Sequence, residues 1–354
     1  MIAQMKDVAA RAGVSITTVS HVLNKTRAAA PETRARILQA VRELNYHKNV
    51  SACLLKRGQS DCCGLIISDI ENPFFPELVK GFEMASLAHG FDVLVCATNY
   101  DRGLAKKAVG RMIENTVRGV AVMTSQLESR LVEELCQSEV PVVLLDSGSP
   151  RRGRSGIRVD YSHGAREAVK HLCHLGHRTA AVLAGPGDRR SAVAYKRTVL
   201  GILSQFGLNA ALVRECEFSV AGGLDGALWL LQQSSFPTAI ITGNDLTAIG
   251  VMQGLADAGI RIPEDVSIVG VDDIAFAQYT HPSLTTVRVP RGRLGELAFE
   301  AIEKILRSKR RLGKRYVLRS ELIVRRSTGR APEGKCVAAR EGSLSPATTL
   351  PPFA

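Results

Sequence analysis

Three histidines and a cysteine stand close together in one segment of this sequence and could hold a metal ion. The segment HLCHLGH carries them as His171, Cys173, His174 and His177, which are residue types that bind zinc. His171 and His174 can share one face of a helix, whereas Gly176 is typical of a helix end and separates His177 from that face. The spacing therefore does not predict a metal site.

The segment GRAPEGKC, at residues 329–336, has the glycine spacing of a phosphate-binding loop, in which backbone N–H groups surround a phosphate. Cys336 stands where such a loop needs Ser or Thr, and no helical pattern follows it. The sequence has no GxSxG, HExxH or dinucleotide-binding motif. We therefore predict a protein that is not an enzyme and that needs no cofactor or metal.

The 354-residue chain carries a formal net charge of +12, and its basic residues gather toward the two ends. Residues 1–60 hold ten Lys and Arg against three Asp and Glu, and residues 291–330 form a second basic stretch. The residues between these stretches are close to neutral. This uneven distribution favours a basic module that binds nucleic acid, attached to a body with another task.

Hydropathy and cysteine usage indicate the compartment. No apolar run reaches the roughly 18 residues of a membrane span, and the N-terminus lacks the apolar stretch of a signal peptide. The eight cysteines are scattered, several of them in apolar segments, which favours reduced thiols over structural disulfides. We expect a cytoplasmic protein without a membrane partner.

The first sixty residues predict three short helices that can position side chains on DNA. MKDVAARA, ITTVSHVLN and PETRARILQAVREL each carry apolar residues at helical spacing. Gly13 predicts a tight turn after the first segment, Ser15 can cap the second, and Pro31 suits the start of the third. Together the segments predict a helix-turn-helix domain.

From residue 64 onward, short apolar runs alternate with helical stretches in two series. The first series runs from GLIIS to VPVVLLD, and the second runs from AAVLAG to VSIVGVDD. Such alternation predicts a parallel, doubly wound α/β sheet in each series, and therefore two lobes with a cleft between them. Residues 290–306 have the pattern of an amphipathic helix that returns the chain to the first lobe.

The segment MKDVAARAGVSITTVSHVLNKTRAAAPETRARILQAVRELNY resembles the DNA-binding domain of the LacI/GalR family of transcription regulators, and its purine-responsive members in particular. SDIENPFFPELVKGFE, GHRTAAVLAGP, TAIITGNDLTAIGVMQGLADAGIRIPEDVSIVGVDD and AQYTHPSLTTVRVP are similar to later segments of the family, so the resemblance covers residues 3 to about 328. It implies an α/β fold with an N-terminal three-helix helix-turn-helix domain and a two-lobed, doubly wound body like that of periplasmic binding proteins.

Four regions follow from the composition and the resemblance. We expect a DNA-binding domain at 1–47, a hinge helix and linker at 48–60, an effector-binding and dimerisation domain at 61–330, and a disordered tail at 331–354. Within the third region, lobe 1 is expected at about 61–160 and 290–318, and lobe 2 at about 161–289 and 319–330.

The resemblance implies a recognition helix in the major groove of DNA. Ile16, Thr17 and His21 occupy the base-reading positions of the family, where Ile16 can contact a thymine methyl and His21 a purine edge. The remaining residues expected on this surface have phosphate-binding, capping or charge-neutralising roles: Thr18, Ser20, Asn24 and Arg27.

The resemblance also implies a hinge helix that enters the minor groove of DNA. Leu55 falls on the position of the family's wedging Leu, and Lys56 follows it. Three residues depart from the family pattern: Lys48, Cys53 and Leu54. The Cys53 change lowers the positive charge of the hinge, and a disordered tether is the alternative interpretation of this segment.

Ligands of open α/β sheets bind at the C-terminal ends of strands, where this sequence places Asp69, Asn244 and Asp272. Asp272 matches the effector-binding Asp of the family, while Phe75 and Phe218 fall on aromatic positions that pack against a ring. We therefore expect these residues to bind a small effector.

Arginine positions leave the charge of the effector open. In YKRTVLG, Arg197 is the nearest equivalent of the family's pocket Arg, displaced by about two residues. Arg189 and Arg190 precede it and favour an anionic effector, such as a sugar acid or a phosphorylated sugar. The alternative is that these arginines are solvated surface residues.

The combined prediction is a transcriptional repressor that binds a near-palindromic double-stranded DNA operator as a homodimer. Its affinity for DNA would be controlled by a sugar or sugar derivative bound in the cleft. Two alternatives remain: a purine- or nucleoside-responsive regulator of the same family, and a soluble sugar-binding protein without a DNA function.

Overall fold

The computed structural model describes residues 3–23, 27–46, 60–124, 127, 129–145 and 150–333. The chain divides into two compact units, Met1–Ser60 and Asp61–Ala354. Apart from Ser60 and residues 331–333, the predicted hinge and the predicted tail lie outside the described residues.

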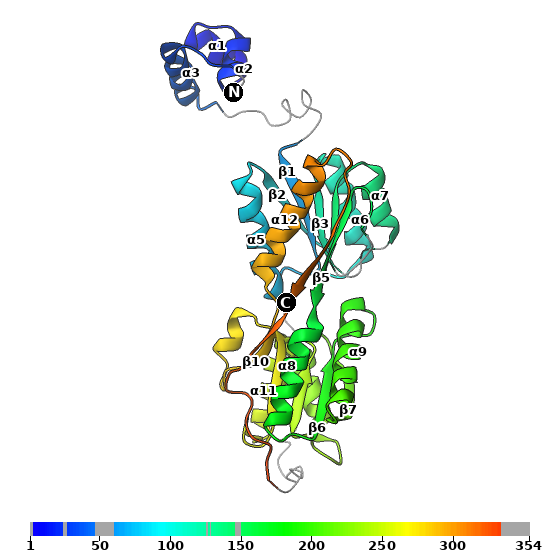
Figure 1. The fold of residues 1–354 in the computed structure, drawn as a ribbon. Coiled ribbons are helices and arrows are strands. Elements are labelled where there is room, and N and C mark those ends of the chain that lie inside the picture. Colours follow the sequence, from blue (N-terminus) through cyan, green and yellow to red (C-terminus); the bar gives the residue numbers. More distant parts are fainter. Residues whose placement is uncertain are drawn as a thin grey trace. The chain divides into compact units, whose positions relative to one another are not determined.

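The first unit contains three helices around a small core (Figure 1): α1 (Met5–Ala12), α2 (Ile16–Leu23) and α3 (Pro31–Glu43). Gly13 ends α1 in the left-handed conformation, with φ of +63°, and its N–H donates to the carbonyls of the last turn. Buried residues from all three helices form the core: Val8, Ala9, Ala12, Val19, Val22, Ile37, Ala40 and Tyr46. The predicted helix-turn-helix arrangement is confirmed.

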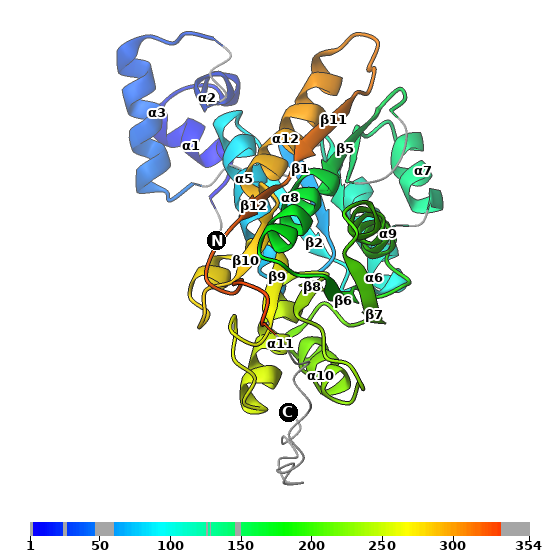
Figure 2. The same ribbon diagram turned by 60° about the horizontal axis from the view of Figure 1, so that its bottom comes forward.

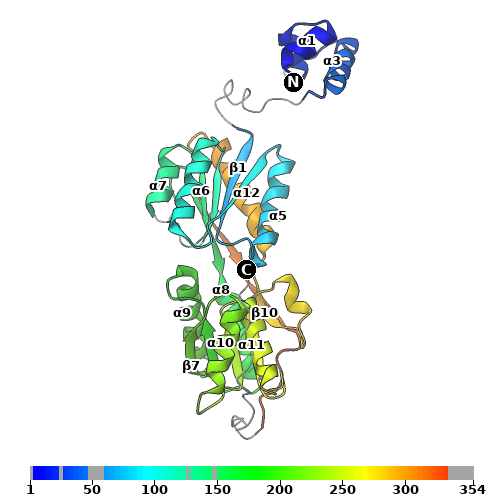
Figure 3. The same ribbon diagram turned by 180° about the vertical axis from the view of Figure 1, so that it is seen from behind.

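The first sheet of the second unit has six strands in the order β11-β5-β4-β3-β1-β2, and neighbouring strands run parallel. The strands are β1 (Cys62–Ile67), β2 (Asp92–Ala97), β3 (Val120–Met123), β4 (Val142–Leu145), β5 (Arg154–Asp160) and β11 (Arg315–Arg319). Figure 3 shows that α5 (Phe74–Ala88) and α12 (Arg291–Arg307) cover one face, and α6 (Arg102–Glu114) and α7 (Ser129–Gln137) the other.

The second sheet also has six strands, in the order β12-β10-β9-β8-β6-β7, and only β12 runs antiparallel to its neighbour. The strands are β6 (Thr179–Ala184), β7 (Asn209–Glu215), β8 (Ala239–Thr242), β9 (Ser267–Asp272), β10 (Thr285–Arg288) and β12 (Glu321–Ile323). Helices α8 (Tyr161–His174) and α9 (Arg190–Gln205) cover one face. On the other face lie α10 (Val220–Leu231) and α11 (Asp245–Asp257), and the short helix η1 (Ala275–Gln278) follows β9.

The chain passes between the two sheets three times: from β5 into α8, from β10 into α12, and from β11 into β12. Figure 2 shows α12 beside α5 on the first sheet. Their close approach depends on glycine, because a Cβ at Gly295 would lie 2.0 Å from the carbonyl oxygen of Leu78. The predicted doubly wound, two-lobed body is therefore confirmed, and α12 matches the helix predicted at 290–306.

Five strands were not predicted from the sequence: β5, β7, β10, β11 and β12. β7 and β11 alternate exposed and partly buried residues, because each lies at an edge of its sheet. β10 lies inside the second sheet, but its buried threonines hide it from a search for apolar runs. Short apolar runs identify most readily the strands that are covered on both faces.

The histidines of HLCHLGH have a structural role within the described residues. His177 is 1% exposed, and its ring lies 3.0 Å from the hydroxyl oxygens of both Thr238 and Ser267 and 3.1 Å from the carbonyl oxygen of Gly329. These contacts attach the segment after β12 to the second sheet.

Across the described part of the chain, no group of three or more His, Cys, Asp or Glu could hold a metal ion, and no helix is long and apolar enough to cross a membrane.

We expect His177→Ala to lower the free energy of unfolding of the full chain by about 2–4 kcal/mol, because it opens a cavity and removes one hydrogen-bond partner each from Thr238, Ser267 and Gly329. Urea denaturation followed by circular dichroism measures this loss. His174→Ala is the matched control, since His174 is exposed at the end of α8, and should change stability by less than about 0.5 kcal/mol. Equal effects of the two substitutions would contradict the role of His177.

Candidate functional site

The outer face of α2 presents the predicted base-reading residues. Val19 and Val22 point into the core, while Ile16 is 52% exposed and Thr17 is exposed. At about 100° per residue, Ile16, Thr17 and His21 fall within an arc of roughly 140° on the side of the helix away from these valines. An exposed Ile at the start of a helix leaves apolar surface available for a partner.

The other predicted DNA-contacting residues are distributed differently. Thr18 takes part in the N-terminal cap of α2, because its N–H donates to the Ser15 hydroxyl at 3.1 Å and the two hydroxyl oxygens lie 2.8 Å apart. Ser20 is partly buried and Arg27 is exposed. Asn24, Leu55 and Lys56 lie outside the described residues.

A cavity of about 110 Å³ lies between the C-terminal ends of the strands of the two sheets. Its lining from the first sheet's side is Ser68, Asn72, Phe74, Phe75, Tyr100, Met123, Thr124 and Leu145. Its lining from the second sheet's side is Tyr161, Arg189, Ser191, Ala192, Tyr195, Phe218, Gly243, Asn244, Val271 and Asp272. We call this cavity the inter-lobe pocket. Six of its residues are Phe or Tyr, contributed by both sides, so the pocket can enclose a ring.

Asp272 provides an unpaired acidic group in the inter-lobe pocket. It ends β9 and is partly buried, and its carboxylate accepts no hydrogen bond from any residue that the structure describes. Desolvation, together with the nearby Asp245 carboxylate, raises the pKa of Asp272 well above its usual range. A neutral carboxyl group both donates and accepts hydrogen bonds, so it can bind a hydroxyl group or a ring nitrogen of a ligand.

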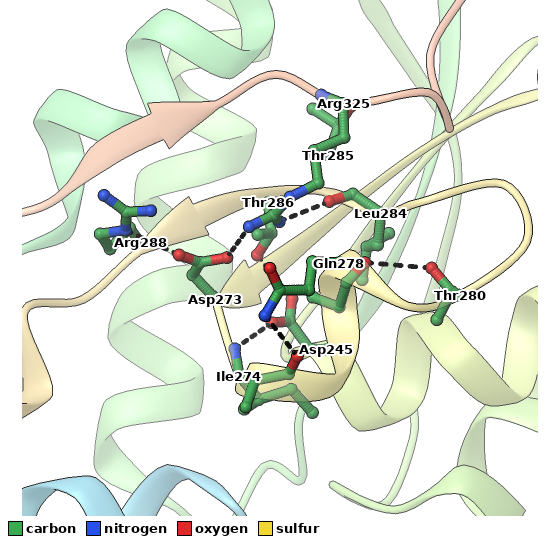
Figure 4. Close-up of polar contacts among 12 residues, drawn as sticks. Asp245, Asp273, Ile274, Gln278, Thr280, Leu284, Thr285, Thr286, Arg288 and Arg325 are labelled. Carbon is green, nitrogen blue, oxygen red and sulfur yellow. Dashed lines mark hydrogen bonds and ion pairs between the residues drawn. The ribbon is translucent and has the colours of Figure 1, made fainter.

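Asp245 lies behind Asp272 and is fully buried at the start of α11. One of its carboxylate oxygens accepts from the Thr286 hydroxyl at 2.5 Å, and the other accepts from the N–H of Ile274 at 2.8 Å (Figure 4). Desolvation outweighs these hydrogen bonds and raises the pKa of Asp245 to about 7. The two carboxyl groups therefore disfavour a further negative charge at this end of the pocket.

The backbone at Asp272 and Asp273 has an unusual conformation that side chains hold in place. Both residues have positive φ, +112° and +57°, which costs a non-glycine residue about 1–3 kcal/mol. The Asp273 carboxylate accepts from Arg288 and from Arg325, each at 2.6 Å, and Figure 4 shows both contacts converging on this carboxylate. These ion pairs fix the loop that presents Asp272 to the pocket.

Arg291 connects this loop to the other lobe. The residue is 5% exposed, and one guanidinium nitrogen lies 2.6 Å from the carbonyl oxygen of Asp273 and 2.7 Å from the Glu77 carboxylate on α5. A second nitrogen lies 3.4 Å from the carbonyl oxygen of Pro73. One guanidinium group therefore links the loop that carries Asp272 to the start of α5.

Arg189 crosses the pocket from the second lobe to the first. Its guanidinium carbon lies 3.8 Å from the centre of the Tyr100 ring and 5.4 Å from that of Phe218, which are cation–π distances. The same group donates to the Glu217 carboxylate at 3.0 Å and is 12% exposed. The charge of Arg189 is therefore already balanced within the protein.

Five of the seven predicted effector-binding residues line the inter-lobe pocket: Phe75, Arg189, Phe218, Asn244 and Asp272. Asp69 and Arg197 do not line it. Asp69 instead accepts the N–H of Glu71 at 2.8 Å in the loop after β1. Arg197 is exposed and lines a neighbouring cavity, because two residues along α9 turn a side chain by about 200°, away from the face that Tyr195 occupies.

Tyr195 and Asn72 are pocket residues that the sequence did not reveal. Tyr195 is 7% exposed, and its ring packs edge-on against Tyr161 with 5.8 Å between the ring centres. In the sequence, Tyr195 is marked only by its place in the apolar spacing of α9, and that spacing fits an ordinary core residue equally well. Asn244 lines the pocket as predicted. Its amide oxygen accepts from the N–H and hydroxyl of Thr247 and caps α11, so the amide nitrogen is the atom of this side chain that can bind a ligand.

Comparison with known proteins places this geometry among regulators of transcription. Residues 4–49 match the profile of bacterial regulatory proteins of the lacI family, and residues 169–328 match a periplasmic binding protein-like domain. The HTH-type transcriptional repressor PurR of Edwardsiella ictaluri is 32% identical over 335 residues, which are 94% of this chain and 98% of that protein.

Two solved structures show the same architecture. The lac repressor dimer bound to operator and the anti-inducer ONPF is 26% identical, with a TM-score of 0.82, covering 93% of this chain and 100% of that one. A LacI family transcriptional regulator from Enterococcus faecium with bound ribose is 26% identical, with a TM-score of 0.69, covering 76% of this chain and 99% of that one.

We expect the buried Asp245 to make stability depend on pH. An unfolded Asp ionises near pH 4, so between about pH 4 and pH 7 the unfolded chain has lost a proton that the folded body keeps, and the free energy of unfolding falls as the pH rises. Asp245→Asn removes this ionisation. Its stability relative to wild type, measured by urea denaturation, should rise by roughly 1–3 kcal/mol from about pH 5 to about pH 7.5.

Any hydrogen bond that the Asn side chain loses to Ile274 or Thr286 lowers the stability of this variant by an amount that is the same at both pH values. The difference between the two pH values therefore reports the ionisation of Asp245 and its coupling to Asp272. Asp257→Asn, which changes an exposed residue at the other end of α11, is the control and should keep a constant difference from wild type. A constant difference for Asp245→Asn as well would refute the assignment.

Proposed function

Because the chain belongs to the LacI family and is a DNA-binding transcriptional repressor, we propose that a small cyclic effector in the inter-lobe pocket controls its affinity for DNA. The proposal depends most on the Asp272 carboxyl group. It accepts no hydrogen bond from any residue that the structure describes, and it lines a pocket with aromatic rings from both lobes. A ligand that contacts both walls stabilises one arrangement of the lobes over others. By linkage, the same ligand must change the affinity for operator DNA.

The coupling path begins at Asp272 and follows contacts between the lobes. A ligand on Asp272 acts on the strained loop that Arg288 and Arg325 hold. Arg291 then transmits a displacement of this loop to α5 through Glu77. The contact between Arg291 and the Asp273 carbonyl oxygen crosses from one lobe to the other, so a movement of the lobes against each other changes it and can bias the equilibrium between lobe arrangements.

A sugar or sugar derivative is the effector class that we propose first. The regulator from Enterococcus faecium binds ribose with the same type of body, and hydroxyl groups suit Asp272 and the Asn244 amide nitrogen. A purine base or nucleoside is the second candidate. It is favoured by the aromatic lining and by Asp272, which in its neutral form can pair with ring nitrogens.

For the DNA-binding unit, we propose that Ile16, Thr17 and His21 read bases and that two copies of the chain bind a near-palindromic operator in the cytoplasm. The exposed Ile16 supports this role, and the lac repressor structure contains a dimer on its operator. Asn24, Arg27, Leu55 and Lys56 are proposed to contact the DNA backbone or the minor groove.

The division of labour on α2 predicts two kinds of DNA-binding defect. Ile16→Ala and His21→Ala should each weaken binding to a duplex selected from a random pool by about 10- to 100-fold, and binding to random duplex much less, because base contacts provide discrimination. Arg27→Ala should weaken both by a similar factor, because a phosphate contact carries no sequence information. Fluorescence anisotropy at one fixed salt concentration compares them, and parallel losses for all three variants would exclude base reading by Ile16 and His21.

The effector site is tested by titration calorimetry with ribose, glucose, adenine and guanine. We expect a ligand of one class to bind wild type, and Asp272→Ala to weaken that binding by about tenfold or more, because a partly buried polar partner is lost. Asp69→Ala, outside the pocket lining, should stay within about threefold of wild type. If Asp272→Ala keeps the affinity of the ligand that binds wild type, or if both variants lose affinity equally, the proposed site is wrong.

A further inference from the structure

A second cavity, of about 320 Å³, adjoins the inter-lobe pocket. Four residues line both cavities: Leu145, Tyr161, Ser191 and Tyr195. The inter-lobe pocket is small beside the roughly 300–1,000 Å³ of most ligand sites. A ligand larger than a single ring can use the second cavity, which we call the arginine cavity, if it extends past Tyr161 and Tyr195.

Three arginines line the arginine cavity and are exposed, so their guanidinium groups are accessible to a ligand: Arg158, Arg190 and Arg197. Arg190 and Arg197 lie seven residues apart on α9, so they share one face of the helix about two turns apart. Arg158 comes from β5, which belongs to the first sheet. Basic residues from two lobes thus meet at one cavity.

These arginines are not committed to other groups of the protein. Arg190 and Arg197 form no ion pair with any described residue. The acidic side chain in the cavity lining, Asp160, caps α8: its carboxylate accepts the N–H of Ser162 at 3.1 Å and the Ser162 hydroxyl at 2.5 Å. Three positive groups therefore face one carboxylate that is already hydrogen-bonded.

Backbone and hydroxyl groups add to the preference for an anion. Helix α9 begins at Arg190, and no side chain among the described residues caps its N-terminus. Its first turn, with Arg190 and Ser191, lines the arginine cavity, so helix N–H groups and the positive end of the helix dipole lie at this wall. The hydroxyl-bearing residues Ser162 and Thr198 also line it.

The inter-lobe pocket has the opposite character. Asp272 and Asp245 lie at one end, and the charge of Arg189 is balanced by Glu217 and covered by the Tyr100 ring. An anionic group is therefore disfavoured beside Asp272 and favoured in the arginine cavity. The two adjoining cavities fit a ligand that has a ring with hydrogen-bonding groups at one end and an anion at the other.

We propose that the arginine cavity is a phosphate subsite and that the effector is a phosphate monoester of a sugar or nucleoside. The ring of this effector occupies the inter-lobe pocket, and its phosphate binds Arg158, Arg190 and Arg197. The placement of the ring rests on the function proposed above. Guanidinium groups suit this ligand because they bind phosphate oxygens through charged, often bidentate, hydrogen bonds.

The test compares phosphorylated and unphosphorylated members of two pairs, ribose with ribose 5-phosphate and adenosine with AMP, by titration calorimetry on the full chain. Wild type should bind the phosphorylated member of one pair at least about tenfold more tightly than its partner. The double variant Arg190→Gln, Arg197→Gln should bind the phosphorylated member about 10- to 100-fold more weakly than wild type does. Its affinity for the unphosphorylated member should fall by less than about threefold. Arg178→Gln, an exposed arginine before β6, is the matched control and should retain both affinities.

Inorganic phosphate probes the subsite without a ring. It should raise the melting temperature of wild type more than that of the double variant, and it should compete with the phosphorylated ligand. The phosphate subsite is refuted if neither phosphate nor any phosphorylated compound distinguishes wild type from the double variant. If unphosphorylated compounds then still bind wild type, and Asp272→Ala weakens that binding, the proposed effector function stands without a phosphate subsite.

Discussion

The ion pairs around Asp273 are the constraint on which the geometry of the body depends. Its carboxylate holds Arg288 and Arg325, and its carbonyl oxygen accepts from the buried Arg291. These contacts keep two consecutive aspartates at positive φ, a conformation that the backbone alone does not favour. The same contacts attach the second lobe to α5 of the first, so the site residue Asp272 and the lobe junction are parts of one structure.

The distribution of charge gives the two adjoining cavities different tasks. The environment of Asp245 and Asp272 disfavours negative charge at one end of the inter-lobe pocket, whereas three arginines line the neighbouring cavity. Arg189, which is the predicted arginine that lines the inter-lobe pocket, pairs with Glu217 and packs against the Tyr100 ring. A positive residue near a pocket therefore indicates a ligand charge only when no other group of the protein balances it.

Helix α9 shows how far the site could be predicted. The sequence identified aromatic and acidic positions at strand ends, and Phe75, Phe218 and Asp272 do line the pocket. It did not identify Tyr195, and Arg197, the nearest sequence equivalent of the family's pocket Arg, lines the neighbouring cavity. A displacement of two residues matters little in a sequence alignment, but it turns a helical side chain by about 200°.

The sequence by itself determined the architecture: three short helices with a basic surface, and two doubly wound sheets joined by a returning helix. Apolar periodicity and turn residues specify such elements locally, because each element must bury one face. Only the tertiary structure decided which charges are free. Arg291 meets Glu77, and His177 meets Gly329, across more than a hundred residues of chain. Contacts between segments so distant in sequence leave no local pattern, since they exist only after the sheets have packed.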